Sequence, residues 1–103
     1  MKCIGIDGES IQPFGYCLLA SSSGKRLSEG RRLTSRECFD FILGQSEPGS
    51  RLFGYGIGYD VCHWVMDLSA EEKGRLAANG VCYTMQGATV YRLTYRPNAY
   101  FTV

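Results

Sequence analysis

Residues 4–10 read IGIDGES, a run in which apolar residues give way to two acids set two positions apart. With the residues before it, this run predicts a buried strand over residues 2–7. Side chains two apart in a strand lie on one face, so Asp7 and Glu9 are expected to converge on a common cation. Asp60, at the start of a predicted helix, is expected to complete the same site.

Carboxylates that converge on hard divalent cations are typical of two-metal phosphodiester hydrolysis. One ion generates the nucleophile, and the other stabilises the leaving oxygen. The pattern therefore predicts a nuclease-type site in which Asp7, Glu9 and Asp60 are both metal ligands for Mg²⁺ or Mn²⁺ and catalytic residues. A second interpretation stays open, because acids are also favoured where a strand leads into a turn and in the first turn of a helix.

The remaining pattern predicts an α/β fold with a mixed β-sheet and flanking helices. A strand meander comes first, and a crossover helix then brings in a fourth strand. Two capping boxes mark helix starts, Thr34 with Glu37 and Ser69 with Glu72, and Gly80 is expected to end the last helix. The predicted strands cover residues 2–7, 14–20, 24–33, 51–57, 81–85, 89–96 and 99–103, and the predicted helices cover residues 34–43, 59–68 and 69–80.

Composition fits one domain over residues 1–103, since 45% of the chain is hydrophobic and a second core has no room. Residues 73–103 carry four Lys or Arg and no acid, which suits either a nearby phosphate backbone or an ordinary solvated edge. No apolar run is long enough to span a membrane, and no signal-peptide pattern opens the chain. Five widely spaced cysteines predict reduced, mostly buried thiols and a cytoplasmic protein.

His63 is the only histidine and follows Asp60 by three residues, so the two are expected on the same face of a helix. It is expected to hydrogen-bond Asp60, to touch substrate, or to be a partly exposed histidine without a role. The glycines at positions 54, 56 and 58 do not complete a dinucleotide fingerprint, and they predict a close approach of this strand to its neighbours or to nucleic acid.

Several runs together resemble the amino-terminal exonuclease region of phage- and plasmid-type family B DNA polymerases. The first exonuclease motif of that family is similar to IGIDGES, and the second is similar to Tyr59-Asp60. The runs that carry the resemblance are FGYGIGYDV at residues 53–61, MDL at 66–68, Leu76, VYRLTYRP at 90–97 and YF at 100–101.

The resemblance implies an RNase H-like (DnaQ-like exonuclease) fold and 3'-5' removal of nucleotides from the end of single-stranded DNA. It implies that Asp7 and Glu9 hold the metals at the scissile phosphate and that Asp60 completes their coordination. Gly58 and Tyr59 would bind substrate along the path of the strand, with His63 nearby.

The third exonuclease motif of the family should end in an aspartate, yet no acid follows Glu72. The chain also stops inside the strand-like residues 99–103. We therefore expect a partial exonuclease-like domain, incomplete at the C-terminus and weak or inactive, which a further polymerase segment or a partner chain would complete. The alternatives are a non-catalytic module that binds single-stranded nucleic acid or protein, and a homodimer paired through terminal strands.

Overall fold

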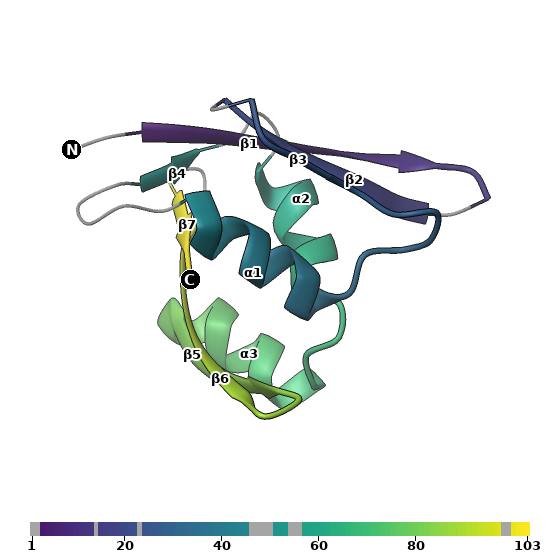
Figure 1. Ribbon diagram of the computed structural model, residues 1–103. Helices are drawn as coiled ribbons and strands as arrows, with labels where there is room; N and C mark the ends of the chain where they lie inside the picture. The colour runs from purple at the N-terminus through teal and green to yellow at the C-terminus, as the bar shows by residue number, and fades with distance from the viewer. Residues whose placement is uncertain (1–2, 14, 23, 46–50, 54–56, 98–99) are drawn as a thin grey trace.

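The protein is seen in a computed structural model that describes residues 3–13, 15–22, 24–45, 51–53, 57–97 and 100–103. Side chains are described in these ranges except at residues 3, 4, 51–53 and 57–59. The prediction of an α/β protein is confirmed (Figure 1). The elements are β1 (Cys3–Ile11), β2 (Gly15–Ser21), β3 (Arg26–Ser28), α1 (Ser35–Gln45), β4 (Arg51–Phe53), α2 (Ile57–Trp64), α3 (Ala70–Asn79), β5 (Val81–Gln86), β6 (Thr89–Arg96) and β7 (Tyr100–Thr102).

The strands form one mixed sheet in the order β3-β2-β1-β4-β7-β6-β5. Strands β1 to β3 form the predicted antiparallel meander, and α1 then crosses over so that β4 pairs parallel to β1. Strand β7 continues the sheet antiparallel to β4, and β6 and β5 follow antiparallel. Two three-stranded antiparallel units are therefore joined through β4.

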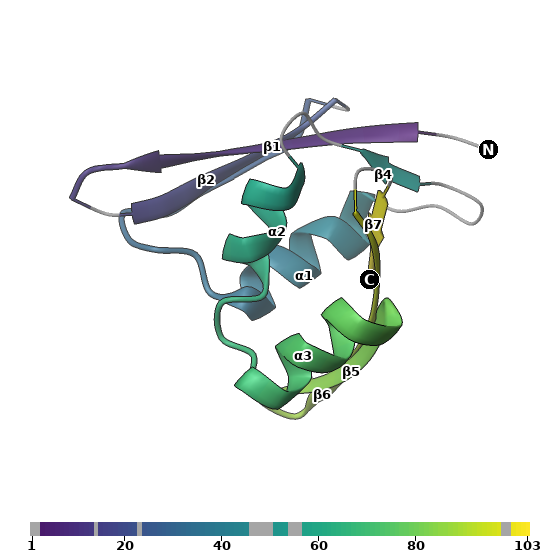
Figure 2. The ribbon, with the colours of Figure 1, turned by 180° about the vertical axis from the view of Figure 1, so that it is seen from behind.

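The sheet curves around the helices. Figures 1 and 2 show β1–β3 at one end, β5 and β6 at the other, and the three helices in the space between. The core is aromatic at its centre, where the Trp64 ring meets the edge of the Phe101 ring at a centroid distance of 5.2 Å. Both side chains are fully buried, and so are Phe39, Leu19 and Leu93.

Both predicted capping boxes are present. At α1, the Thr34 amide donates to Glu37 Oε1 at 2.9 Å, and the Glu37 amide donates to Thr34 Oγ1 at 3.1 Å. Ser69 and Glu72 repeat this exchange at α3, which ends in Gly80 at a left-handed φ of 73°. These helix ends are set by local contacts that a sequence shows directly.

Several predicted boundaries were wrong. Strand β1 runs to Ile11 instead of ending at residue 7, and α2 begins at Ile57, a residue predicted in a strand. Strand β3 covers three residues instead of the ten predicted, and α2 ends at Trp64 although its apolar pattern continues to Leu68. The Asp67 amide donates to Ser35 Oγ at 2.9 Å, outside any helix, and the Ser35 amide donates to Asp67 Oδ2 at 2.8 Å. This exchange with the start of α1 competes with helical hydrogen bonding at residue 67.

The four cysteines with described side chains are free thiols. Cys17, Cys38 and Cys82 are buried and Cys62 is exposed, as the prediction of reduced, mostly buried thiols requires. Burial raises the pKa of Cys38 to about 12, so this thiol stays protonated. Within the described part of the chain, no helix has both the length and the apolar character to cross a bilayer.

Candidate functional site

The predicted site forms around a tyrosine that lies beneath the first strand. Tyr16, on β2, is buried, and its hydroxyl passes directly under Gly8 of β1. A Cβ atom added at Gly8 would lie 1.9 Å from Tyr16 Oη, which no real contact permits. The absence of a side chain at Gly8 therefore makes room for the tyrosine.

Asp60 accepts a hydrogen bond from this tyrosine. Its side chain is 1% exposed, and Oδ1 accepts a hydrogen bond from Tyr16 Oη at 2.8 Å. Tyr16 Oη in turn accepts a hydrogen bond from Trp64 Nε1 at 3.1 Å. The indole, phenol and carboxylate thus form a buried chain in which each group has a partner, as buried polar groups require.

His63 lies on the same side of α2, as its spacing from Asp60 predicts. Its ring stacks on the Tyr16 ring with centroids 4.5 Å apart and planes inclined by 7°. Partial burial lowers the pKa of His63, and the positive charge of Arg32 lowers it further. A neutral imidazole stacked on a phenol is a packing contact, and the described geometry shows no hydrogen bond from His63 to Asp60.

Burial is the main cause of the raised pKa values of Asp60 and Tyr16. Loss of solvation raises the pKa of Asp60 to about 6, although the hydrogen bond from Tyr16 lowers it, and the charges of Asp7 and Glu9 add a further rise. The pKa of Tyr16 is raised, first by burial and then by the neighbouring Asp60. Tyr16 therefore remains a hydrogen-bond donor, and Asp60 gains or loses its proton near pH 6.

Asp7 and Glu9 share a face of β1, as their spacing predicts, but that face is turned away from Tyr16. Both acids are exposed, whereas Ile6 and Gly8, which alternate with them, are buried. Asp7 Oδ1 also accepts a hydrogen bond from the Gly8 amide at 3.0 Å. The structure thus brings the acid pair within electrostatic range of Asp60 but places it on the opposite face of the strand.

The predicted two-ion site of Asp7, Glu9 and Asp60 stays a prediction. Among residues with described side chains, no group of three or more His, Cys, Asp or Glu is arranged to hold a metal ion. Asp60 is buried and accepts a hydrogen bond from Tyr16, whereas Asp7 and Glu9 are exposed. Gly58 and Tyr59 lie in the first turn of α2, but the side chain of Tyr59 falls outside the described residues, as do Gly54 and Gly56.

Sequence reasoning missed Tyr16 and Trp64 as members of this site. The signal was present in two forms: a tyrosine inside an apolar strand needs a buried partner for its hydroxyl, and a glycine in the adjacent strand leaves space. Trp64 is buried in the core, as its place in the apolar pattern of α2 predicts, and its indole N–H also donates to the Tyr16 hydroxyl that binds Asp60.

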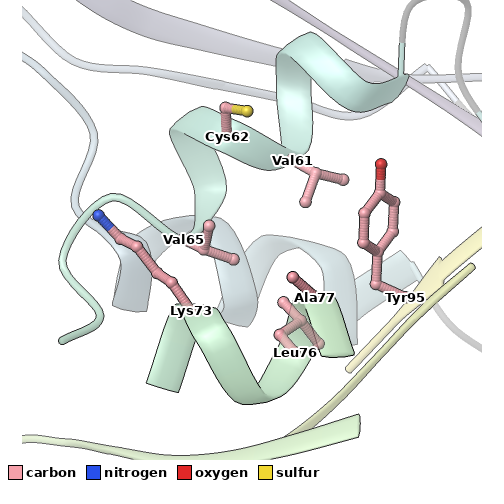
Figure 3. A pocket seen from close by; sticks show the side chains of 7 residues that line it. All are labelled: Val61, Cys62, Val65, Lys73, Leu76, Ala77 and Tyr95. Atoms are coloured by element: carbon pink, nitrogen blue, oxygen red, sulfur yellow. The ribbon is translucent and has the colours of Figure 1, made fainter. Parts of the chain in front are cut away.

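A pocket of about 310 Å³ opens on the other side of α2, between α2, α3 and β6 (Figure 3). Its wall is mainly apolar, with Val61, Val65, Leu76 and Tyr95, and Lys73 and Cys62 also line it. His63 projects from α2 roughly opposite to Val61 and Val65, and Asp60 lies about 100° around the helix from Val61, because successive helical residues turn by about 100°. The described residues that line the pocket include no carboxylate or imidazole, so it is separate from the predicted site.

Comparison of the chain with protein-family models, with curated proteins and with solved structures found no match. The resemblance to family B polymerase exonucleases stays a prediction from the residues quoted for it.

Proposed function

We propose that this chain is a domain of the DnaQ-like 3'-5' exonuclease type that binds single-stranded DNA without hydrolysing it in the arrangement described. The strand order supports an RNase H-like scaffold. An RNase H-like core begins with an antiparallel meander and a helical crossover to a fourth strand, and the order β3-β2-β1-β4 with parallel β1 and β4 follows that plan.

The placement of Asp60 carries the non-hydrolytic part of the proposal. Two-metal hydrolysis needs carboxylates that meet around the same ions. Here Asp60 is buried and hydrogen-bonded to Tyr16, whereas Asp7 and Glu9 are exposed.

The charge distribution supports nucleic acid as the ligand. No acid follows Glu72, whereas four cationic side chains lie in residues 73–103. Lys and Arg that neutralise phosphates give binding that weakens steeply with salt.

Two measurements on the whole chain test the proposal. The first follows thermal unfolding while Mn²⁺ is titrated, with Asp7→Asn as the control. A ligand held only by the folded state raises stability by mass action, so we expect wild type and Asp7→Asn to respond equally.

The second measurement follows a fluorescent single-stranded oligonucleotide with Mn²⁺ present. We expect salt-sensitive binding with no shortening of the strand. Shortening that depends on Mn²⁺ and is lost in Asp7→Asn would show a working metal site and contradict the proposal, as would an absence of binding at low salt.

A further inference from the structure

The strands β5, β6 and β7 expose a face that no described element covers. Helices α1 and α3 pack on the other face, where Cys82, Tyr91, Leu93 and Phe101 are buried. Side chains alternate along a strand, so the residues between these point outward. Two outward Tyr–Arg pairs define what we call the Tyr–Arg face: Tyr83, Arg92, Arg96 and Tyr100.

Each pair consists of direct neighbours on adjacent strands. Tyr83 on β5 lies opposite Arg92 on β6, and Tyr100 on β7 lies opposite Arg96. Tyr83 is 62% exposed, a high value for an aromatic ring, and both arginines are exposed. The two arginines are four residues apart, which is about 13 Å along a strand.

The face is positive and lacks acids. The ion pairs found among described residues engage Arg31, Arg32, Arg36 and Arg75, and none engages Arg92 or Arg96. The segment from residue 81 to 103, which forms the whole of β5, β6 and β7, contains no Asp or Glu. The Arg92 guanidinium is thus available to an external anion, and the exposed Arg96 guanidinium lies beside Gly80 at the end of α3.

We propose that the Tyr–Arg face is the surface that binds single-stranded nucleic acid, which rests on the proposed function and names where the strand lies. Exposed aromatic rings on an open sheet stack on unpaired bases, and adjacent arginines contact phosphates or stack in turn. The positive charge of the face favours a negatively charged nucleic acid as the ligand. An apolar protein partner would gain only the small patch at the hairpin end, where Met85 lies opposite Val90.

The experiment measures binding of a fluorescent oligo-dT to the whole chain by anisotropy over a range of salt. We expect Tyr83→Ala to weaken binding roughly tenfold, since one base stack contributes that much, and Tyr83→Phe to bind nearly as wild type. Arg92→Ala should also weaken binding and lower the salt slope by about one. The matched control is Arg26→Ala, which removes the same charge from exposed β3 at the opposite end of the sheet and should change affinity less than threefold.

Each result separates this inference from the proposed function. If wild type binds but Tyr83→Ala and Arg92→Ala behave like Arg26→Ala, the strand lies elsewhere and only the location is overturned. If wild type does not bind, the proposed function fails and this inference with it. A mass that rises with concentration and falls in Tyr83→Ala, without an effect on oligonucleotide binding, would assign the face to self-association instead. Equal melting temperatures will show that the variants are folded, because the substituted side chains are exposed.

Discussion

At the scale of single residues, the face of β1 that Asp7 and Glu9 occupy is explained by Gly8. A period of two shows which side chains share a face of a strand, but it does not show which face is covered. The covered face of β1 at residue 8 carries no side chain, because Tyr16 fills the space, so the sequence has no hydrophobic signal there. The shared face of Asp7 and Glu9 could thus be predicted, whereas their separation from Asp60 could not.

The first prediction concerns Gly8→Ala. The new methyl group would collide with the Tyr16 hydroxyl and displace it from Asp60, so we expect a loss of about 1–3 kcal/mol in the free energy of unfolding. Urea unfolding followed by fluorescence of the single tryptophan, Trp64, measures it. Gly74→Ala is the control, because that helical glycine has open space around it and the change should stabilise by about 0.5–1 kcal/mol. A Gly8→Ala protein as stable as wild type would contradict the described packing.

The second prediction concerns the pH dependence that Asp60 introduces. Its pKa is raised in the folded protein to about 6 from an ordinary value of 3.8, so the folded state holds the proton more tightly than the unfolded chain. The stability contributed by protonation is fully present below pH 3.8 and is lost as pH rises through 6. Two pKa units correspond to about 3 kcal/mol.

Asp60→Asn removes this titration while keeping an acceptor for Tyr16. Measured relative to wild type, the free energy of unfolding of the variant should increase by roughly 2.5 kcal/mol between pH 4 and pH 8, because only wild type loses stability over this range. Any fixed cost of the new amide N–H cancels in this difference between two pH values. Urea unfolding at several pH values provides the data, and a difference that does not change with pH would show that Asp60 is not shielded as described.

At the scale of elements, prediction succeeded where the cause is local. The capping boxes and the left-handed Gly80 each depend on residues within one helical turn, and all appear where the sequence places them. The end of α2 was predicted wrongly because the residues that determine it are distant in the sequence. Asp67 pairs with Ser35 and Arg32, more than thirty residues away in the chain, and no window around residue 67 contains that information.

The two three-stranded units show the same contrast. Their antiparallel pairings follow from short turns and alternating patterns, and the strands were predicted. Their connection through the short β4, and the exposed Tyr–Arg face that results on β5–β7, are consequences of the complete sheet order. The alternation in β5 and β6 did not by itself say which side the helices would cover.

At the scale of the whole molecule, Phe101 connects the two units. It lies on β7 between β4 and β6, opposite Leu52 and Tyr95, and its fully buried ring contacts the Trp64 ring that belongs to the site beneath β1. Tyr95 adds a second aromatic contact at a centroid distance of 6.2 Å. One side chain thus couples the β5–β7 unit to the helix that carries Asp60.

The last prediction is that Phe101→Ala destabilises the entire molecule rather than one unit. Truncation of a buried phenylalanine costs about 3–5 kcal/mol through lost contacts and the cavity left behind. Because this is a large share of the 5–15 kcal/mol typical of small domains, we expect the urea midpoint to fall strongly. Trp64 fluorescence and far-ultraviolet circular dichroism should shift together, since both units depend on the same core. The control, Val90→Ala, removes an exposed side chain and should change stability by less than about 0.5 kcal/mol. Two separate transitions in Phe101→Ala would show that the units are stable without each other, and the coupling assigned to this ring would then be wrong.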